Sequence, residues 1–380
     1  MLSSQLHATT EILPLAGLDR LAAHLPTAWI EEALTATGTA SIRRRRLPAE
    51  QVVWLVIALA LYRHQSMPEV LATLDLALPS ATEQPVSKSA VTQARQRLGA
   101  AALEWLFHQT ARAWCRQDAE RHAWQGLSLW AMDGTTFRTP DSADNRAHFG
   151  AQAYASGKVA SYPQVRAVSV TAIRTHLVSD IAFGAYGQNE MLYAKTLVGR
   201  IADHSLTVFD RGFLCAEILL GLTLSGQERH YLIPAKSNTK WEVLSGSADD
   251  CLVRMRVSPQ ARAKAPELPE HWIARAVRMV SANGKQRVLL TSLLDRRRFK
   301  ADALAECYRR RWEIETSYRE LKQSMLGEAL TLRSQQPAGI AQEIWGALIA
   351  YNLVRLEMAK AALQARVEPT DLSFLRALHI

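Results

Sequence analysis

The residues with the clearest chemical potential are acids that follow apolar segments. Asp133 and Asp210 each come after a short apolar run with the pattern of a β-strand, so we expect both acids at the C-terminal ends of strands. Further acids, including Glu315, lie in the charged stretch 308–322. Carboxylates that converge from these three places would form an oxygen-only site suited to Mg²⁺ or Mn²⁺. Two such ions can support phosphoryl transfer.

The stretch 308–322, Y-R-R-R-W-E-I-E-T-S-Y-R-E-L-K, carries charges of both signs. We expect one helix, on which Tyr308, Arg311, Glu315 and Lys322 share a face because of their spacing. In this interpretation Glu315 binds a metal ion. Arg311, Lys322 and the Tyr308 hydroxyl then bind neighbouring DNA phosphates. The alternative is a surface helix whose charges only form salt bridges four residues apart, such as Arg311 with Glu315.

Other charged residues near these motifs have weaker assignments. Glu313 and Glu320 lie off the shared face, so we expect them to point elsewhere. Arg211 follows Asp210 directly and is a candidate phosphate contact. Glu190 is either an acid at a helix N-terminus or a secondary residue of the site.

Composition restricts the class of partner. Lys and Arg total 45 against 36 Asp and Glu, a net charge of +9 that favours nucleic acid or an anionic membrane surface. The longest apolar run, 52–62, is shorter than the roughly 18 residues of a membrane span and predicts a buried helix. The N-terminus lacks the pattern of a signal peptide. The four cysteines are scattered, which predicts neither a zinc site nor a disulfide framework and fits a reducing cytoplasm. The sequence contains no Walker A and no G-x-G-x-x-G motif, so we expect no bound nucleotide cofactor.

The length of 380 residues suggests two or three units. The core pattern, β-β-β-α-β-α, predicts an α/β fold with a mixed sheet and helices on its faces. The expected organisation is a helical N-terminal DNA-binding domain over 1–120, a catalytic core over 121–236 that resumes over 286–335, a β-rich insertion over 237–285 and a C-terminal helical segment over 336–380.

Within the N-terminal domain, S-K-S-A-V-T-Q-A-R-Q-R-L-G (87–99) predicts a helix capped by serine and ended by glycine. Arg95 and Arg97 make this helix basic, and its place after an earlier helix gives the outline of a DNA-binding helix-turn-helix. The alternative, of equal weight, is a solvated helix face.

The spacing Y-x2-R-x3-E-x6-K, formed by Tyr308, Arg311, Glu315 and Lys322, resembles the signature of DDE transposases of the insertion sequence 4 family. The resemblance continues upstream, in the same order, through the motifs D-G-T-T, Y-P-Q-V-R, F-D-R-G and L-L-T-S. It covers most of 125–330.

The resemblance implies an RNase H-like core with Asp133, Asp210 and Glu315 as the catalytic and metal-binding triad for Mg²⁺ or Mn²⁺. It implies that a metal-activated water cuts one strand at a transposon end and that the freed 3′-hydroxyl is the next nucleophile. In this family the hydroxyl commonly forms a hairpin before transfer to target DNA. A metal-dependent nuclease that joins nothing and a non-catalytic DNA-binding regulator are the alternatives.

The implied partners are double-stranded DNA, as transposon terminal repeats and target, and a second copy of the chain in a homodimeric synaptic complex. The final stretch, 369–380, stops soon after a capped helix begins. We expect relatives to continue further, with a segment that supports dimerisation.

One position departs from the family pattern. Relatives place an aromatic residue, which stacks on a flipped base, just before the L-L-T-S strand, where this chain has Arg287. Arginine stacks on a base less well than an aromatic ring does. Trp241 and Trp272 of the insertion are alternative stacking residues.

Overall fold

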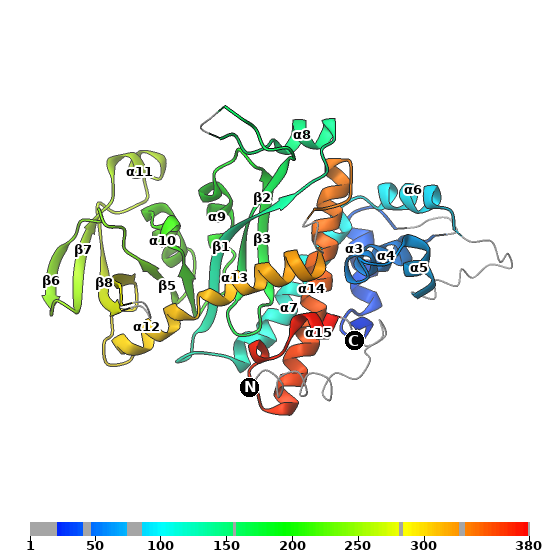
Figure 1. Cartoon of the computed structure of the whole chain (residues 1–380). Helices are drawn as coiled ribbons and strands as arrows, with labels where there is room; N and C mark the ends of the chain where they lie inside the picture. Colours follow the sequence, from blue (N-terminus) through cyan, green and yellow to red (C-terminus); the bar gives the residue numbers. More distant parts are fainter. Residues whose placement is uncertain are drawn as a thin grey trace.

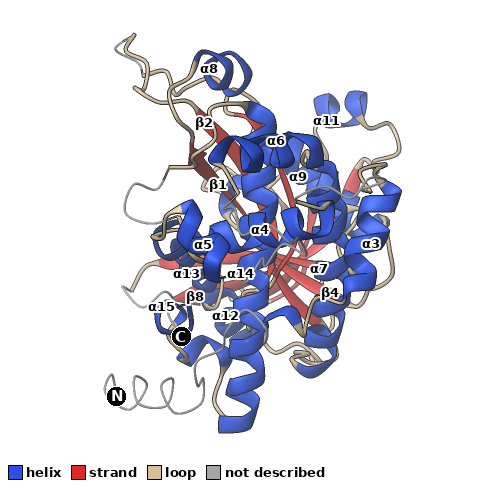
Figure 2. Ribbon diagram, turned by 90° about the vertical axis from the view of Figure 1, so that its right-hand side faces the viewer, coloured by secondary structure: helices blue, strands red, loops and turns tan. Residues whose placement is uncertain are grey.

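The computed structural model describes residues 21–40, 47–73, 86–154, 157–280, 284–326 and 331–378. These residues form one mixed sheet of nine strands with helices packed on both faces (Figure 1). A quarter-turn shows the strands enclosed by helices (Figure 2). The expected α/β class is therefore confirmed. None of the helices within the described ranges combines the length and apolar character that crossing a bilayer requires.

The first five strands have the order that an RNase H-like core requires. Along the sheet they run β3-β2-β1-β4-β5, with β1 antiparallel to β2 and parallel to β4. Helices α9 and α10 make the crossovers that the parallel neighbours need. These strands are β1 (Ser128–Arg138), β2 (Gln164–Ala172), β3 (Val178–Ala185), β4 (Ser205–Phe209) and β5 (Arg229–Pro234).

The β-rich insertion extends the same sheet. Strand β9 pairs with β5 on one side and β8 on the other, and β7 and β6 follow outward. The insertion therefore shares continuous backbone hydrogen bonding with the core. The added elements are β6 (Glu242–Gly246), β7 (Asp250–Arg256), α11 (Pro259–Lys264), β8 (His271–Val280) and the returning core strand β9 (Gln286–Thr291).

Helices precede, connect and follow these strands. Before β1 the described ranges contain helices and no strand, as expected for the N-terminal region. The helices are α3 (Thr27–Ala36), α4 (Ala49–Leu61), α5 (Met67–Thr73), α6 (Lys88–Leu98), α7 (Ala101–Arg121), α8 (Ala143–Phe149), α9 (Glu190–Val198), α10 (Ala216–Leu224), α12 (Ala301–Arg309), α13 (Trp312–Arg319), α14 (Pro337–Ala365) and α15 (Phe374–Leu378).

Alternating side chains of β1 divide the apolar core between the two faces of the sheet. Trp130 and Met132 join the cluster that includes residues of α7, α9, α10 and α14. Leu129 and Ala131 join the cluster formed with α12 and α13, which cross in front of the strands in Figure 1. The sheet thus holds α12 and α13, which carry the candidate site residues, on the face opposite α9 and α10.

Helix α14 belongs to the packing of the N-terminal region rather than to a separate C-terminal unit. It packs against both α4 and α7, and most of its side chains are buried around its circumference. A helix that is apolar on all sides needs such neighbours on all sides. The N-terminal helices, α14 and the sheet therefore share one hydrophobic core.

The expectation of a single helix over 308–322 is wrong. Helix α12 ends at Arg309, and α13 begins at Trp312 after a tight turn in which the N–H of Arg311 donates to the carbonyl of Tyr308. A π-helical turn, Glu320–Met325, then follows α13. Because a π turn contains more residues than an α turn, α-helical spacing does not extend to Lys322.

We expect Gly346→Ala in α14 to destabilise the protein. A methyl group there would lie 2.7 Å from Val56 Cγ1 and 3.3 Å from Val56 O of α4. Overpacking of this kind costs about 1–3 kcal/mol, which denaturant unfolding measures. The control is Gly221→Ala in α10, where the nearest atom is 3.8 Å away. The control should be neutral or slightly stabilising; equal stability of both variants would contradict the close packing of α14 on α4.

Candidate active site

Asp133 lies in the middle of β1, so its expected position at a strand end is wrong. Strand β2 pairs with β1 in antiparallel fashion as far as Arg138. This pairing keeps Asp133 and Gly134 in the strand, although Asp and Gly are poor strand formers alone. The parallel pairing with β4, however, stops at Met132 opposite Phe209. Asp210 follows Phe209 directly, so both acids lie where β4 ends.

Arg311 joins the third acid to this pair. Its Nη2 lies 2.8 Å from Glu315 Oε1, and its Nη1 lies 3.5 Å from Asp133 Oδ2. The other oxygen of Asp133 accepts the N–H of Gly134 at 2.8 Å, and Asp210 Oδ2 accepts the N–H of Gly212 at 3.1 Å. The turn between α12 and α13 thus places one guanidinium between two of the predicted carboxylates.

Electrostatics links all three acids. Burial raises the pKa of Asp133 to about 6, and the negative charges of Asp210 and Glu315 act in the same direction. The Gly134 N–H and Arg311 act in the opposite direction. Three carboxylates around one guanidinium leave excess negative charge, and a hard oxygen donor set of this kind fits a divalent cation.

With the guanidinium between them, the acids are not gathered as metal ligands. Across the described ranges, no three His, Cys, Asp or Glu side chains are close enough together to hold one metal ion. The carboxylate oxygens are therefore suitable ligands for a divalent cation, but the three acids are spaced around the guanidinium of Arg311 rather than around one ion.

Three of the predicted DNA contacts border this cluster. Arg211, Tyr308 and Arg311 line a cleft of about 680 Å³ that also contains Asp210. Burial raises the pKa of Tyr308, and the charge of Asp210 adds to this rise, which places the phenol beside that acid. Lys322 is not among the residues that line this cleft; burial and the charge of Arg138, at the end of β1, lower its pKa.

The cleft also clarifies the departure from the family pattern. Arg287 of β9 and Trp241 of the insertion both line it. Trp272 instead donates from its indole nitrogen to the Tyr231 hydroxyl at 3.2 Å and packs against the core. Of the two tryptophans considered for stacking, only Trp241 thus borders the cleft.

Glu313 and Glu320 point away from the acids, as expected. His176 lies between them, with ring nitrogens 3.0 Å from Glu313 Oε2 and 3.2 Å from Glu320 Oε2. Glu320 also accepts from Tyr351 at 2.7 Å and pairs with Arg355 at 3.5 Å. Burial raises the pKa of Glu320, but Arg355 and His176 outweigh it and hold this pKa at about 2.

Sequence reasoning missed Tyr318. Its hydroxyl donates to the backbone carbonyl of Asp133 at 2.6 Å and lies 2.9 Å from Ser169 Oγ. It therefore ties α13 to the strand that carries the first acid. Its position three residues after Glu315, on the same helix face, was the available signal.

Glu190 lies at a helix N-terminus and close to β1. It is the first residue of α9, after the capping residue Asn189. Its carboxylate lies against Gly134, where an added Cβ would approach its Cδ to 2.7 Å, and it is 3.8 Å from Arg166. Glu190 is thus a helix N-terminal acid that also covers the residue next to Asp133.

The predicted basic helix is α6, with Ser87 as its cap. Arg97 is exposed, whereas the Nε of Arg95 donates to Gln342 Oε1 of α14 at 2.8 Å and burial lowers its pKa. The connection from α5 to α6 includes 74–85, which lies outside the described residues. The helix-turn-helix interpretation therefore remains a prediction.

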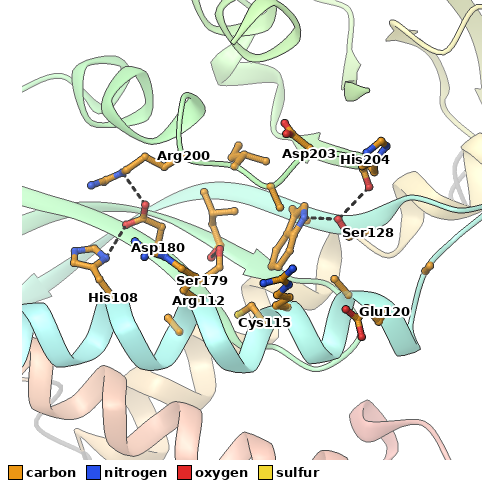
Figure 3. A pocket seen from close by; sticks show the side chains of 18 of the residues that line it. His108, Arg112, Cys115, Glu120, Ser128, Ser179, Asp180, Arg200, Asp203 and His204 are labelled. Atoms are coloured by element: carbon orange, nitrogen blue, oxygen red, sulfur yellow. Dashed lines mark hydrogen bonds and ion pairs between the residues drawn. The ribbon is translucent and has the colours of Figure 1, made fainter. Parts of the chain in front are cut away.

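A larger cavity, of about 1020 Å³, lies between α7 and the β2–β3 edge and contains none of the predicted site residues (Figure 3). Asp180 is its central acid, 2.8 Å from Arg200 and 3.7 Å from His108. Arg112, Arg116 and Arg200 face Glu120, Asp180 and Asp203, so the charges balance. Balanced charge does not favour a polyanion here.

Comparisons with known proteins identify the family of this chain. Residues 15–108 match the family described as insertion element 4 transposase N-terminal, and residues 124–353 match the transposase DDE domain. The transposase InsG for insertion sequence element IS4 of Escherichia coli (strain K12) is 40% identical over 360 residues, 94% of this chain and 80% of the relative. InsZ of the same strain is 37% identical over 237 residues, 61% of this chain and 77% of that protein.

A piggyBac transposase synaptic complex with hairpin DNA aligns over 99% of this chain and 78% of its own, with 9% identity and a TM-score of 0.42, too low to support an argument. The family matches suffice. The chain belongs to the DDE transposases, in the family of insertion sequence 4.

The protein is thus a transposase of a bacterial insertion sequence, an enzyme that binds, cuts and joins DNA and depends on divalent metal ions. The two sequence-based alternatives, a nuclease that joins nothing and a non-catalytic regulator, are set aside.

We expect Asp133→Asn to stabilise the metal-free protein at neutral pH. A folded pKa of about 6, against the usual 3.8, means that ionised Asp133 destabilises the fold above pH 6 and ceases to do so below the unfolded pKa. The gain should be at most about 2–3 kcal/mol and should vanish as the pH falls towards 4. Thermal unfolding with chelator, from pH 8 to pH 4, measures it.

The matched control is Asp141→Asn, which alters an exposed surface pair with Arg146. That variant should change stability little at any pH. If Asp133→Asn were less stable than the parent protein at pH 8, the electrostatic cost assigned to this carboxylate would be wrong.

Proposed function

We propose that Asp133, Asp210 and Glu315 are the catalytic triad and hold Mg²⁺ or Mn²⁺ during cleavage and joining of transposon ends. The observation that carries this proposal is the pair of contacts from Arg311 to Asp133 and Glu315, together with the raised pKa of Asp133 beside Asp210. When bound, the ions supply activation of the attacking hydroxyl and neutralise charge on the phosphate.

The residues around the cleft bind the DNA strand in this proposal. Arg211 and Tyr308 hold phosphates next to the scissile bond, and Arg311 joins them once DNA is present. Lys322 lies near Arg138, the last residue of β1, and contacts the DNA strand at that end of β1. Arg287 and Trp241 offer a guanidinium and an indole for a displaced base. In these roles the residues position the phosphate, and no covalent protein intermediate is needed.

The N-terminal region supplies the rest of the binding energy. Exposed Arg97 on α6 contacts a backbone phosphate, whereas Arg95, also predicted to bind DNA, is partly engaged by Gln342. Two copies of the chain bind two transposon ends as a homodimer, in the cytoplasm where the DNA lies. The units 1–120, 121–236, 237–285, 286–335 and 336–380 remain our proposed division of the chain.

Removing one charge from the triad should abolish chemistry and spare binding. Asp133→Asn, Asp210→Asn and Glu315→Gln should each lower cleavage and joining of a transposon-end duplex by about a thousandfold or more, as the loss of several kcal/mol of transition-state stabilisation requires. Gel-shift affinity for the same duplex, measured with chelator so that no metal ion is bound, should stay the same or rise, because repulsion of phosphate falls. Near-normal cleavage by all three variants would refute the triad.

Two controls belong to this experiment. Glu306→Gln removes an acid of α12 that is exposed and paired with Arg309, and it should keep full activity. Glu313→Gln should also remain active, because that carboxylate faces His176 rather than the triad. Glu320 is unsuitable, since its burial beside Arg355 makes its loss a test of folding. An inactive Glu313→Gln with an active Glu315→Gln would reverse the assignment.

Arg97 and Arg95 should separate DNA binding from packing. Arg97→Ala should weaken end binding and lower the slope of log affinity against log salt by about one unit. Arg95→Ala should mainly lower the thermal unfolding temperature, because it removes a bond to the buried Gln342. Unchanged affinity and slope in Arg97→Ala would show that α6 presents only a solvated face.

A further inference from the structure

Arg311 occupies an unusual position for a residue that binds only DNA. Its side chain is 13% exposed and contacts Asp133 Oδ2 and Glu315 Oε1, one oxygen from each of two triad acids. A guanidinium and a divalent cation would therefore compete for the same two oxygens. The positive charge of Arg311 also offsets two effects that disfavour ionised Asp133, namely its burial and its repulsion by the other two acids.

The neighbouring cleft offers the guanidinium another partner. Arg311 lines its wall together with Arg211, Lys236, Arg278, Lys285 and Arg287, whereas Asp210 is the one acid among the lining residues described. Such a surface attracts the phosphates of a DNA strand. A phosphate bound there would give Arg311 a charge-assisted contact equivalent to the carboxylate contact that it leaves.

We propose that Arg311 is a placeholder for the divalent cation: without DNA it ties Asp133 to Glu315, and on DNA binding it turns to a phosphate in the cleft and releases both oxygens. This inference rests on the proposed triad and adds a coupling between its two ligands. DNA raises the affinity for the metal ion, and the metal ion raises the affinity for DNA by the same factor. The acids are then fully assembled only around substrate.

The length and place of Arg311 suit this movement. It lies in the turn between α12 and α13, so its backbone belongs to neither helix, and its donors are at the end of a flexible side chain. Tyr308 lies three residues earlier and lines the same cleft, and the charges of Arg311 and Asp210 both affect the pKa of its hydroxyl. The movement therefore needs a change of rotamer and no change of fold.

The test measures Mn²⁺ binding by electron paramagnetic resonance, with full-length protein alone and with a transposon-end duplex. Parent protein should bind Mn²⁺ about tenfold more tightly with DNA than without it. Arg311→Gln should bind Mn²⁺ about tenfold more tightly than the parent in the absence of DNA, and DNA should then add little. Mn²⁺ held by the duplex itself is measured with the duplex in the absence of protein and is subtracted.

Arg309→Gln is the matched control, because it removes an arginine of α12 that pairs with Glu306 on the surface. It should behave as the parent protein does. If Arg311→Gln does not fold, Arg311→Lys replaces it: a single ammonium cannot bridge both acids as a guanidinium does, so Mn²⁺ should again bind more tightly than in the parent without DNA.

These measurements distinguish the placeholder role of Arg311 from the proposed metal site itself. If Arg311→Gln, or Arg311→Lys in its place, binds Mn²⁺ no more tightly than the parent in the absence of DNA, the placeholder role is wrong while the triad stands. An undiminished effect of DNA on Mn²⁺ affinity in that variant also overturns it. If Asp133→Asn and Glu315→Gln bind Mn²⁺ like the parent protein with DNA present, the proposed metal site itself is wrong.

Discussion

Asp133, Asp210 and Glu315 are carboxylates whose charges oppose one another, and several parts of this fold act against that repulsion. Two of them are fixed by backbone: β1 and β4 run parallel until Met132 meets Phe209, so Asp133 and Asp210 follow from one register. The third, Glu315, comes from a helix on the other side of a long insertion. Its approach depends on side-chain contacts from Arg311 and Tyr318.

The position of that helix is in turn set by a buried ionic cluster. Glu320, at the end of α13, is held by His176 from the β2–β3 turn and by Tyr351 and Arg355 from α14. Breaking such a cluster leaves an uncompensated charge, which strongly opposes alternative positions. Since α14 also packs on α4, helix α13 and the N-terminal helices are anchored to the same element.

Local sequence pattern was enough to predict the β-β-β-α-β-α order of the core, apart from the short helix α8, together with the capped helix α6 and several of the residues that line the cleft. It failed where long-range pairing decides the structure. Asp133 continues a strand because β2 pairs beside it, and Arg95 is drawn against Gln342, which lies far along the chain. The break between α12 and α13 at Arg310-Arg311 contains no glycine or proline that would have predicted it. Helical periodicity therefore identified Glu315 correctly as a neighbour of Arg311 and overextended the helix to Lys322.

The pairing of β5 with β9 has a mechanical consequence for the cleft. One wall belongs to β5, and the other belongs to β9 and to the insertion strand β8 beside it, so all are strands of one hydrogen-bonded sheet; β5 and β9 pair through Ile233 and Leu290. Opening these walls like a jaw would require breaking the ladder between them. The enclosure is thus stiff, and adaptation falls to the nucleic acid, which must unstack or bend to enter. Sequences that deform easily at the transposon end would then be processed faster than rigid ones, without any contact to their bases.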